Sequence, residues 1–189
     1  MMEMQNSLVN QPPQLDHPVI DLPRCGEETV KFVVTYLTFL RDTEQLLSES
    51  FIATAQRHRA TVDAHDLCLY LARYSQSSVA QLTPFMRQYT RSLQGKLPAE
   101  GVRGGLLDGG HLKELTLLLD LQDTALLVNQ AKLGWIVLHQ IALALKDQKL
   151  QQAASQGLDQ TKQQLHWLES YIKLVVLRTA LMPHPQAVA

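Results

Sequence analysis

The sequence has little cysteine and no Cys-x-x-Cys pair, and this shortage excludes two classes of site. Its 189 residues contain two cysteines, Cys25 and Cys68, which are too few and too far apart for a zinc knuckle or a thioredoxin-like motif. We expect both to be buried thiols in a reducing compartment rather than partners in a disulfide.

The sequence also lacks an excess of charge and any long uncharged apolar run. Lys and Arg total 17 and Asp and Glu total 18, so a nucleic-acid-binding protein with a broad basic surface is not expected. Charged residues interrupt each apolar stretch before the roughly 18 uncharged residues of a membrane span are reached. The first 25 residues carry no basic segment followed by an apolar run, as a signal peptide would. We therefore expect a cytoplasmic protein that binds neither nucleic acid nor a membrane.

The pattern that is present is helical. Apolar residues recur three and four positions apart in four stretches, at about 27–58, 63–93, 111–146 and from about 147 onward, which predicts four long helices. Pro84 is expected to kink or restart the second helix, with Thr83 as a cap. Gly134 is expected to allow close packing or a bend in the third, and Asp147 to cap the fourth.

The connections predict the arrangement of these helices. The joints near Thr61 and Asp147 are short, so the first two and the last two helices should form antiparallel hairpins. The glycine-rich segment 94–110 reaches roughly 55 Å when extended, which exceeds the roughly 45 Å of a 30-residue helix. We therefore expect an all-α, ferritin-like four-helix bundle over residues 27–178, with two antiparallel hairpins joined by a long crossover loop. Residues 1–26 are expected to form an extended arm and residues 179–189 a tail.

Four segments of the chain carry a resemblance to a known family. They are FLRDTEQLLSESFIATAQRH, LARYSQSSVAQLTPF, LLLDLQDTALLVNQAKLGWIVLHQIALALKD and QTKQQLHWLESYIK. Together with their surroundings, from about residue 27 to residue 178, they resemble a group of bacterial ferritin-like proteins of unknown function. The resemblance implies a fold more than an activity.

The wider ferritin-like superfamily is known for di-iron or di-manganese sites, which need a Glu from each of two helices and a Glu-x-x-His from each of the other two. Glu44 falls on the first expected stripe, where one ligand would lie. The chain contains no Glu-x-x-His, and the matching positions of the other helices lack carboxylate and imidazole groups. These positions are Ser75 and Ser78, Val128 and Ala131, and Leu158 and Thr161. We therefore expect no metal ion or other cofactor in the usual place.

Glu44 is the most informative residue, because an ionised carboxylate in an apolar stripe is costly unless it is paired. It is expected either to tilt toward solvent or to bind a neighbour, with Lys132 and Asn129 as candidates. Alternatively, Glu44, Ser75 and Ser78 line a polar pocket in the bundle interior that binds water or a small molecule. A third possibility is that Glu44 is a remnant of a lost metal site.

The histidines and the glycine-rich run suggest no further site. His139 and His166 are expected at the surface or at an interface, and a metal site that combines them with His65 or His111 is a weaker alternative. The segment 101–113 lacks a preceding strand and the Gly-Lys-Ser/Thr ending of a nucleotide-binding loop. No catalytic residues are assigned.

The expected function follows from the breadth of the apolar surface on the third helix, which one core cannot cover. The apolar residues beside its stripe are Leu119, Leu126, Leu127, Leu133, Val137 and Ile141. A partner subunit or the N-terminal arm could cover the side that the core leaves exposed, and we expect a homodimer. Because the usual di-metal site is missing, we expect the dimer to work as a non-catalytic binding or assembly module. The alternatives are a metal-dependent oxidase or iron-handling protein with a displaced site, and a small-ligand carrier.

Overall fold

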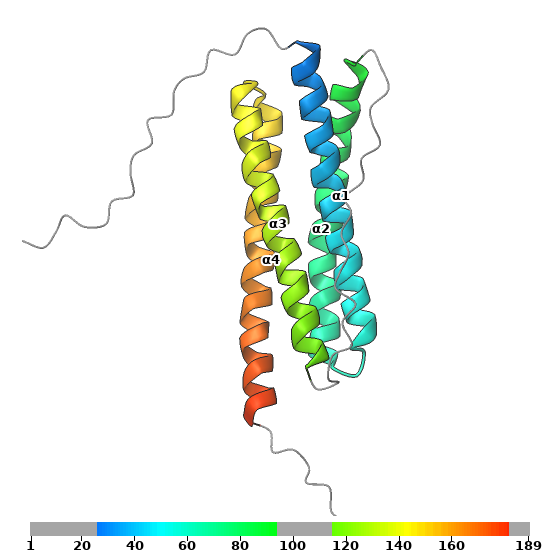
Figure 1. Cartoon of the computed structure of the whole chain (residues 1–189), viewed down its shortest axis with the longest axis vertical. Helices are drawn as coiled ribbons and strands as arrows, with labels where there is room; N and C mark the ends of the chain where they lie inside the picture. Colours follow the sequence, from blue (N-terminus) through cyan, green and yellow to red (C-terminus); the bar gives the residue numbers. More distant parts are fainter. Residues whose placement is uncertain (1–25, 94–114, 182–189) are drawn as a thin grey trace, which may run out of the picture.

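The computed structural model describes residues 26–93 and 115–181, and these form four helices with no strand among them. The helices are α1 (Glu27–Arg57), α2 (Val62–Arg91), α3 (Thr116–Ala144) and α4 (Gln148–Leu181) (Figure 1). The all-α prediction and the four helices are confirmed. The expected arm, crossover loop and tail lie largely outside the described residues, which exclude 1–25, 94–114 and 182–189.

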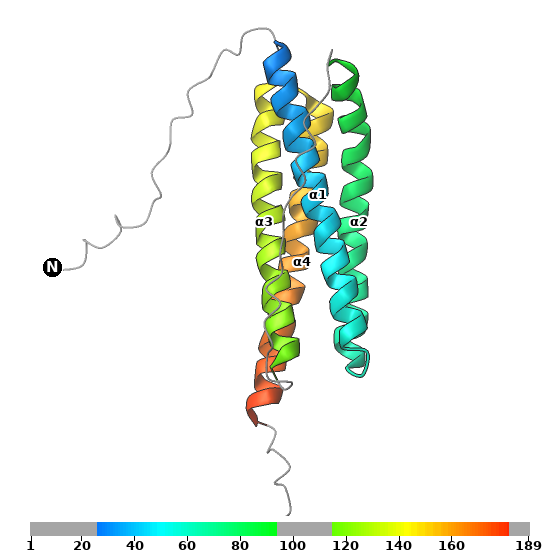
Figure 2. The same cartoon turned by 45° about the vertical axis from the view of Figure 1, so that its right-hand side comes forward.

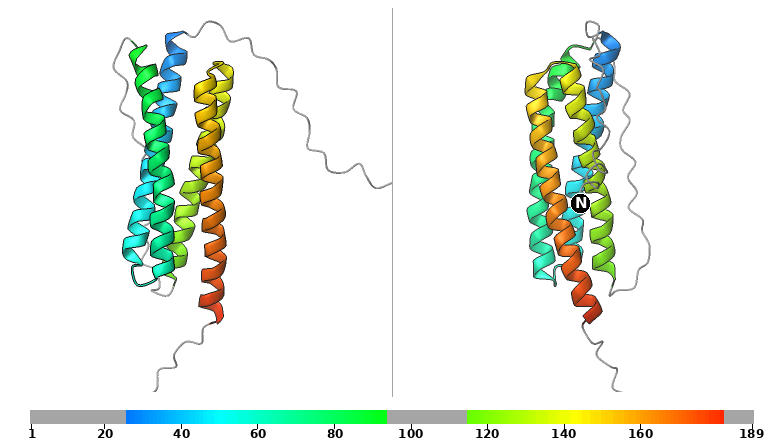
Figure 3. Two further views of the ribbon diagram at one scale, coloured as in Figure 1. Left: turned by 180° about the vertical axis from the view of Figure 1, so that it is seen from behind. Right: turned by 90° about the vertical axis from the view of Figure 1, so that its left-hand side faces the viewer.

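The four helices pack as a bundle in which every neighbouring pair is antiparallel. Helix α1 contacts α2 and α3, and α4 contacts α3 and α2. The chain runs down α1, up α2, up α3 and down α4 (Figures 1 and 2). The diagonal pairs, α1 with α4 and α2 with α3, are therefore parallel, and the view from behind agrees (Figure 3). Both predicted hairpins are present, and α2 ends at the opposite end of the bundle from the start of α3.

The start of α4 follows the local chemistry of the sequence, whereas the course of α2 does not. Asp147 caps α4 as predicted, because its Oδ1 accepts the backbone N–H of Leu150 at 3.0 Å. The predicted restart of α2 at Pro84 is wrong, since the helix runs without a break from Val62 to Arg91. The Thr83 hydroxyl donates back to the Val79 carbonyl at 2.7 Å instead of capping a new helix. The Pro84 ring is exposed, so the helix can continue without burying it.

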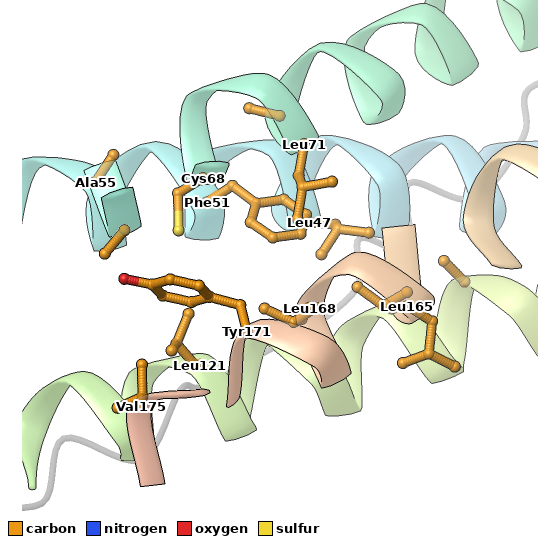
Figure 4. Packing of buried hydrophobic residues seen from close by; sticks show 14 residues of the cluster. Leu47, Phe51, Ala55, Cys68, Leu71, Leu121, Leu165, Leu168, Tyr171 and Val175 are labelled. Atoms are coloured by element: carbon orange, nitrogen blue, oxygen red, sulfur yellow. The ribbon is translucent and has the colours of Figure 1, made fainter. Parts of the chain in front are cut away.

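The core consists of two apolar clusters separated along the bundle axis. One fills the end where α1 begins and includes Leu37, Leu40 and Leu138. The other fills the opposite end, where Leu47, Phe51 and the helix α4 residues Leu168 and Tyr171 meet (Figure 4). Between the two clusters lie buried polar residues from three helices, Glu44, Ser75, Ser78, Thr161 and Gln164, together with the indole of Trp135. We call these six residues the polar layer.

Gly134 brings α1 and α3 close together beside the polar layer, as its position in the sequence predicted. A Cβ atom there would lie 2.6 Å from Leu40 Cδ1. The Tyr36 hydroxyl donates to the Gly134 carbonyl at 3.3 Å across the same contact. No helix in the described ranges combines the length and the apolar character needed to cross a membrane.

Candidate functional site

The centre of the polar layer is the carboxyl group of Glu44, which α1 places in the middle of the bundle. Its side chain is buried, with 0% of the residue exposed. The indole Nε1–H of Trp135 on α3 donates to Glu44 Oε1 at 2.6 Å. The second oxygen, Oε2, is also buried and accepts no hydrogen bond from the residues that the structure describes. One carboxyl oxygen thus accepts a hydrogen bond from a neutral donor, and the other accepts none.

The partner of Glu44 differs from the two that the sequence suggested. Asn129 donates its side-chain amide to the Ala125 carbonyl on its own helix at 3.0 Å. Lys132 is half-buried, and within the described ranges it forms no ion pair with Glu44. Both residues lie beside the stripe of α3 that faces the core, whereas Trp135 lies on that stripe and can reach the carboxylate.

Helices α2 and α4 contribute a second part of the polar layer. The Gln164 side-chain amide donates to the Leu71 carbonyl at 3.0 Å and to Ser75 Oγ at 2.9 Å. The Ser75 hydroxyl in turn lowers the pKa of the Glu44 carboxyl group. Ser78, one turn further along α2, is buried as well. Glu44 and Ser75 are thus neighbours in the polar layer, and Ser78 is buried in the same layer.

Burial dominates the electrostatics of this site. It raises the pKa of Glu44 from 4.5 to about 7, and the hydrogen bond from Trp135 and the polar Ser75 hydroxyl nearby lower that pKa in part. No Lys, Arg or His of the described chain lies within salt-bridge distance of the carboxylate, so no cation opposes the desolvation. Burial therefore favours the protonated carboxyl group, and Oε2 is left able to accept a hydrogen bond.

Trp135 is itself fixed by the close approach of α4. A Cβ atom on Gly157 would lie 2.6 Å from the indole atoms Cδ2, Cε2 and Cε3. Only a glycine fits there while the ring keeps its place, and the buried ring has no space to retreat. Gly157 therefore positions the indole N–H against Glu44.

A second polar cluster links α1 to α3 at the other end of the bundle. Asp120, whose side chain is 8% exposed, accepts a hydrogen bond from Arg57 at Oδ1 and one from His58 Nε2 at Oδ2, the latter at 2.6 Å. The Thr124 hydroxyl donates to the Asp120 carbonyl at 2.8 Å. Arg57 in the last turn of α1 thus neutralises a carboxylate near the start of α3, and His58 just after the helix adds a second hydrogen bond.

The buried thiol of Cys68, beside this cluster, is unreactive. Cys68 is free and buried, and burial raises its pKa to about 12, with the Asp120 carboxylate adding to the effect. A thiol with such a pKa is protonated at neutral pH and is a poor nucleophile. Cys25 lies outside the described residues.

The histidines are spread over separate surroundings. His166 is exposed, as predicted, and its ring meets that of Trp167 edge to face at 6.2 Å between centroids. His65 bonds Asp66 at 2.8 Å, and His139 is half-buried. His111 lies outside the described residues. No group of three or more His, Cys, Asp or Glu side chains in the described part of the chain has the geometry of a metal site.

Sequence reasoning missed Trp135, Gln164 and the cluster around Asp120. Trp135 lies on the predicted stripe of the third helix, so its burial could be expected, but its bond to Glu44 depends on the register between α1 and α3. Gln164 and Asp120 each precede a stripe leucine, and nothing in their spacing marks them as buried.

The outer face of α3 is the other candidate site, because none of its exposed residues is charged. Every exposed residue of α3 is aliphatic or a glutamine. These exposed residues are Gln122, Leu126, Gln130, Leu133, Ile136, Val137, Gln140, Leu143 and Ala144. Leu126 and Leu133 are 70% and 63% exposed, so the face is apolar at its most accessible points.

Comparisons with known proteins do not assign either site. No family model, no curated protein and no solved structure matches the chain.

Proposed function

We propose that the chain is a ferritin-like four-helix bundle without the di-metal site, and that it works as a non-catalytic assembly module that forms a homodimer through the outer face of α3. The observation that carries the proposal is the composition of that face, in which all exposed residues are aliphatic or glutamine. Large uncharged apolar faces on proteins mark interaction sites. The other three helices expose charged residues among their polar ones.

The ferritin-like topology is supported by the order and direction of the helices. Two antiparallel hairpins pack against each other, with α1 beside α3 and α2 beside α4. Because α2 ends and α3 begins at opposite ends of the bundle, the connection between them has to span its length. A single long crossover of this kind distinguishes ferritin-like bundles from bundles with short loops only.

The loss of the di-metal site is supported by the chemistry of the polar layer. Glu44 is its one carboxylate, and the groups around it are a hydroxyl, an amide and an indole N–H. Iron and manganese sites of this superfamily need several carboxylates and imidazoles, so this donor set does not suit them. Metal analysis of protein purified without chelator is expected to find far less than one iron or manganese per chain. A stoichiometric metal that is lost in Glu44→Gln would instead favour the displaced-site oxidase or iron-handling alternative.

A second copy of the chain is the occupant that this face fits best. A helix of 29 residues is about 43 Å long and about 10 Å wide, which gives a projected strip of roughly 430 Å² per copy. Side chains that protrude from the strip enlarge it, so two strips approach the roughly 1,000 Å² that specific interfaces bury. Glutamine both donates and accepts hydrogen bonds, so the face can pair with itself about a two-fold axis without charge repulsion.

The mass of the protein in solution tests the dimer. By analytical ultracentrifugation the wild type is expected to have the mass of two chains, and Leu126→Glu combined with Leu133→Glu the mass of one. Both leucines are exposed, so the change should not unfold the bundle. The matched control is Gln163→Glu with Ser170→Glu, two exposed positions seven residues apart on α4, which should leave the dimer intact. A monomeric wild type, or a dimer that survives the leucine changes, contradicts the proposal.

The small-ligand carrier is kept as a second candidate because Glu44 Oε2 is buried and accepts no hydrogen bond from the described residues. A carrier would bind a small hydrogen-bond donor between the helices, against Oε2 and the Ser75 and Ser78 hydroxyls. Native mass spectrometry of the purified protein tests this candidate. A bound small molecule that disappears in Glu44→Gln would favour it, and bare wild-type chains would count against it.

A further inference from the structure

We propose that Glu44 is a proton-binding site of the folded bundle, in which the carboxyl group takes up a proton at Oε2 while Oε1 keeps its hydrogen bond from Trp135. The inference is independent of the dimer, since Glu44 lies inside the bundle and the proposed interface lies on the outer face of α3. The exchanged ligand is a proton, so the site needs no cavity.

The two carboxyl oxygens of Glu44 differ in their hydrogen bonding. Oε1 accepts a short hydrogen bond of 2.6 Å from the Trp135 indole. Oε2 is buried and receives none from the described residues. A buried charge with an unsatisfied oxygen is unfavourable, and a carboxyl group in this position relieves the cost by binding a proton.

The other residues of the polar layer are all neutral. They are Ser75 and Ser78 of α2, Trp135 of α3, and Thr161 and Gln164 of α4, each of them buried. The charged residues nearest along each helix are exposed, half-buried or paired with one another. They are Arg41 and Asp42, which bond each other on α1, exposed Arg73 on α2, half-buried Lys132 on α3, and Lys162, which pairs with Asp159 on α4.

The Ser75 hydroxyl can accept a hydrogen bond from the protonated carboxyl group of Glu44. Ser75 Oγ has two lone pairs, of which the Gln164 amide uses one. The serine hydroxyl can therefore donate to the carboxylate in one state and accept from the carboxylic acid in the other. The elevated pKa of Glu44, about 7 because of burial, agrees with proton uptake in the neutral range.

The indole of Trp135 offers a direct readout, because its N–H is bonded to the titrating group. The chain has two tryptophans, and the exposed one, Trp167, is removed by Trp167→Phe. In this background the emission of Trp135 is expected to titrate with a midpoint near pH 7. Glu44→Gln should abolish that transition, whereas Glu49→Gln, an exposed change on the same helix, should leave it unchanged.

Carboxyl carbon NMR of the wild-type chain provides a second measurement that needs no variant to fold. One glutamate carboxyl resonance is expected to titrate about two pH units above the exposed glutamates. A flat Trp135 signal between pH 5 and 9, a transition that persists in Glu44→Gln, or glutamate resonances that all titrate below about pH 5 would each overturn the proposal.

Discussion

Gly157 on α4 lies directly against the indole ring of Trp135 on α3, at a separation that leaves no room for a single additional carbon atom. The same indole donates its N–H to Glu44 on α1. Gly157 therefore affects the surroundings of the Glu44 carboxyl group through Trp135. The position of the buried carboxyl group thus depends on α1, α3 and α4 together.

Gly157→Ala should destabilise the bundle despite the better helix propensity of alanine. The added Cβ would lie 2.6 Å from three ring atoms, and overpacking of this kind costs about 1–3 kcal/mol, partly offset by about 1 kcal/mol of propensity. Urea unfolding should show a net loss, together with a shift of the Trp135 emission. Ser155→Ala, at an exposed position of α4, is the control and should cost nothing. A Gly157→Ala protein as stable as the wild type would mean that the ring can move.

Glu44→Gln should change stability in a pH-dependent way. Because the pKa of Glu44 is raised from 4.5 to about 7 on folding, the native carboxyl group favours the folded state fully below pH 4.5, and this contribution is lost as the pH rises to 7. The wild type should therefore lose about 3 kcal/mol relative to Glu44→Gln between pH 4.5 and pH 8. Urea unfolding at both pH values measures the difference. An equal difference at the two pH values would show that Glu44 does not titrate between them.

Trp135→Phe should cost more at high pH than at low pH. The change removes the one donor bonded to Oε1 and leaves a cavity, so it should destabilise the protein by about 2–4 kcal/mol when Glu44 is ionised. At pH 5, where Glu44 is protonated, the charge-assisted part of the cost should be lost, and the cost of the cavity and of the neutral hydrogen bond should remain. Thermal unfolding of single and double variants with Glu44→Gln checks this, since in the glutamine background the cost should not depend on pH.

Asp120→Asn should loosen the contact between α1 and α3. It removes the charge that holds Arg57 and His58, and the loss of a partly buried pair should cost about 1–3 kcal/mol. Asp123→Asn, on the same helix but half-buried, is the matched control. Equal unfolding free energies for the two variants would mean that the cluster contributes nothing to stability.

Asp147→Ala should weaken the turn between α3 and α4. Its carboxylate accepts the Leu150 N–H at 3.0 Å and the Tyr89 hydroxyl at 2.8 Å, and loss of such a cap costs about 1 kcal/mol. Asp159→Ala, in the exposed middle of α4, should cost less. Hydrogen exchange should show faster opening of the first turn of α4 in Asp147→Ala and unchanged exchange in the centre of α3.

The helices and their pairing could be predicted from the sequence because they depend on short-range patterns. The spacing of apolar residues gave the four helices, and the short joints at Thr61 and Asp147 gave the hairpins. The partner of Glu44 could not be predicted in this way. It depends on how far α1 and α3 slide past each other, and a shift of one turn would have placed Ala131 or Leu138 against the carboxylate instead of Trp135.

The serine positions on α2 could be predicted from the sequence, but their hydrogen bonds could not. Their spacing placed Ser75 and Ser78 at the depth of Glu44, and both are buried in the polar layer. The bond from Gln164 to Ser75 depends on the contact between α2 and α4, which are far apart in the sequence. The expected restart at Pro84 did not occur, because an exposed proline can remain inside a long helix.

The alternation of helix directions around the bundle determines the electric field at its two ends. Each end combines two amino-terminal and two carboxy-terminal helix ends, so the partial charges of the backbone dipoles oppose one another at both poles. Neither pole therefore attracts anions or cations through its backbone. Long-range attraction of a charged molecule to this protein has to come from side chains alone, and the formal net charge of −1 leaves little of it.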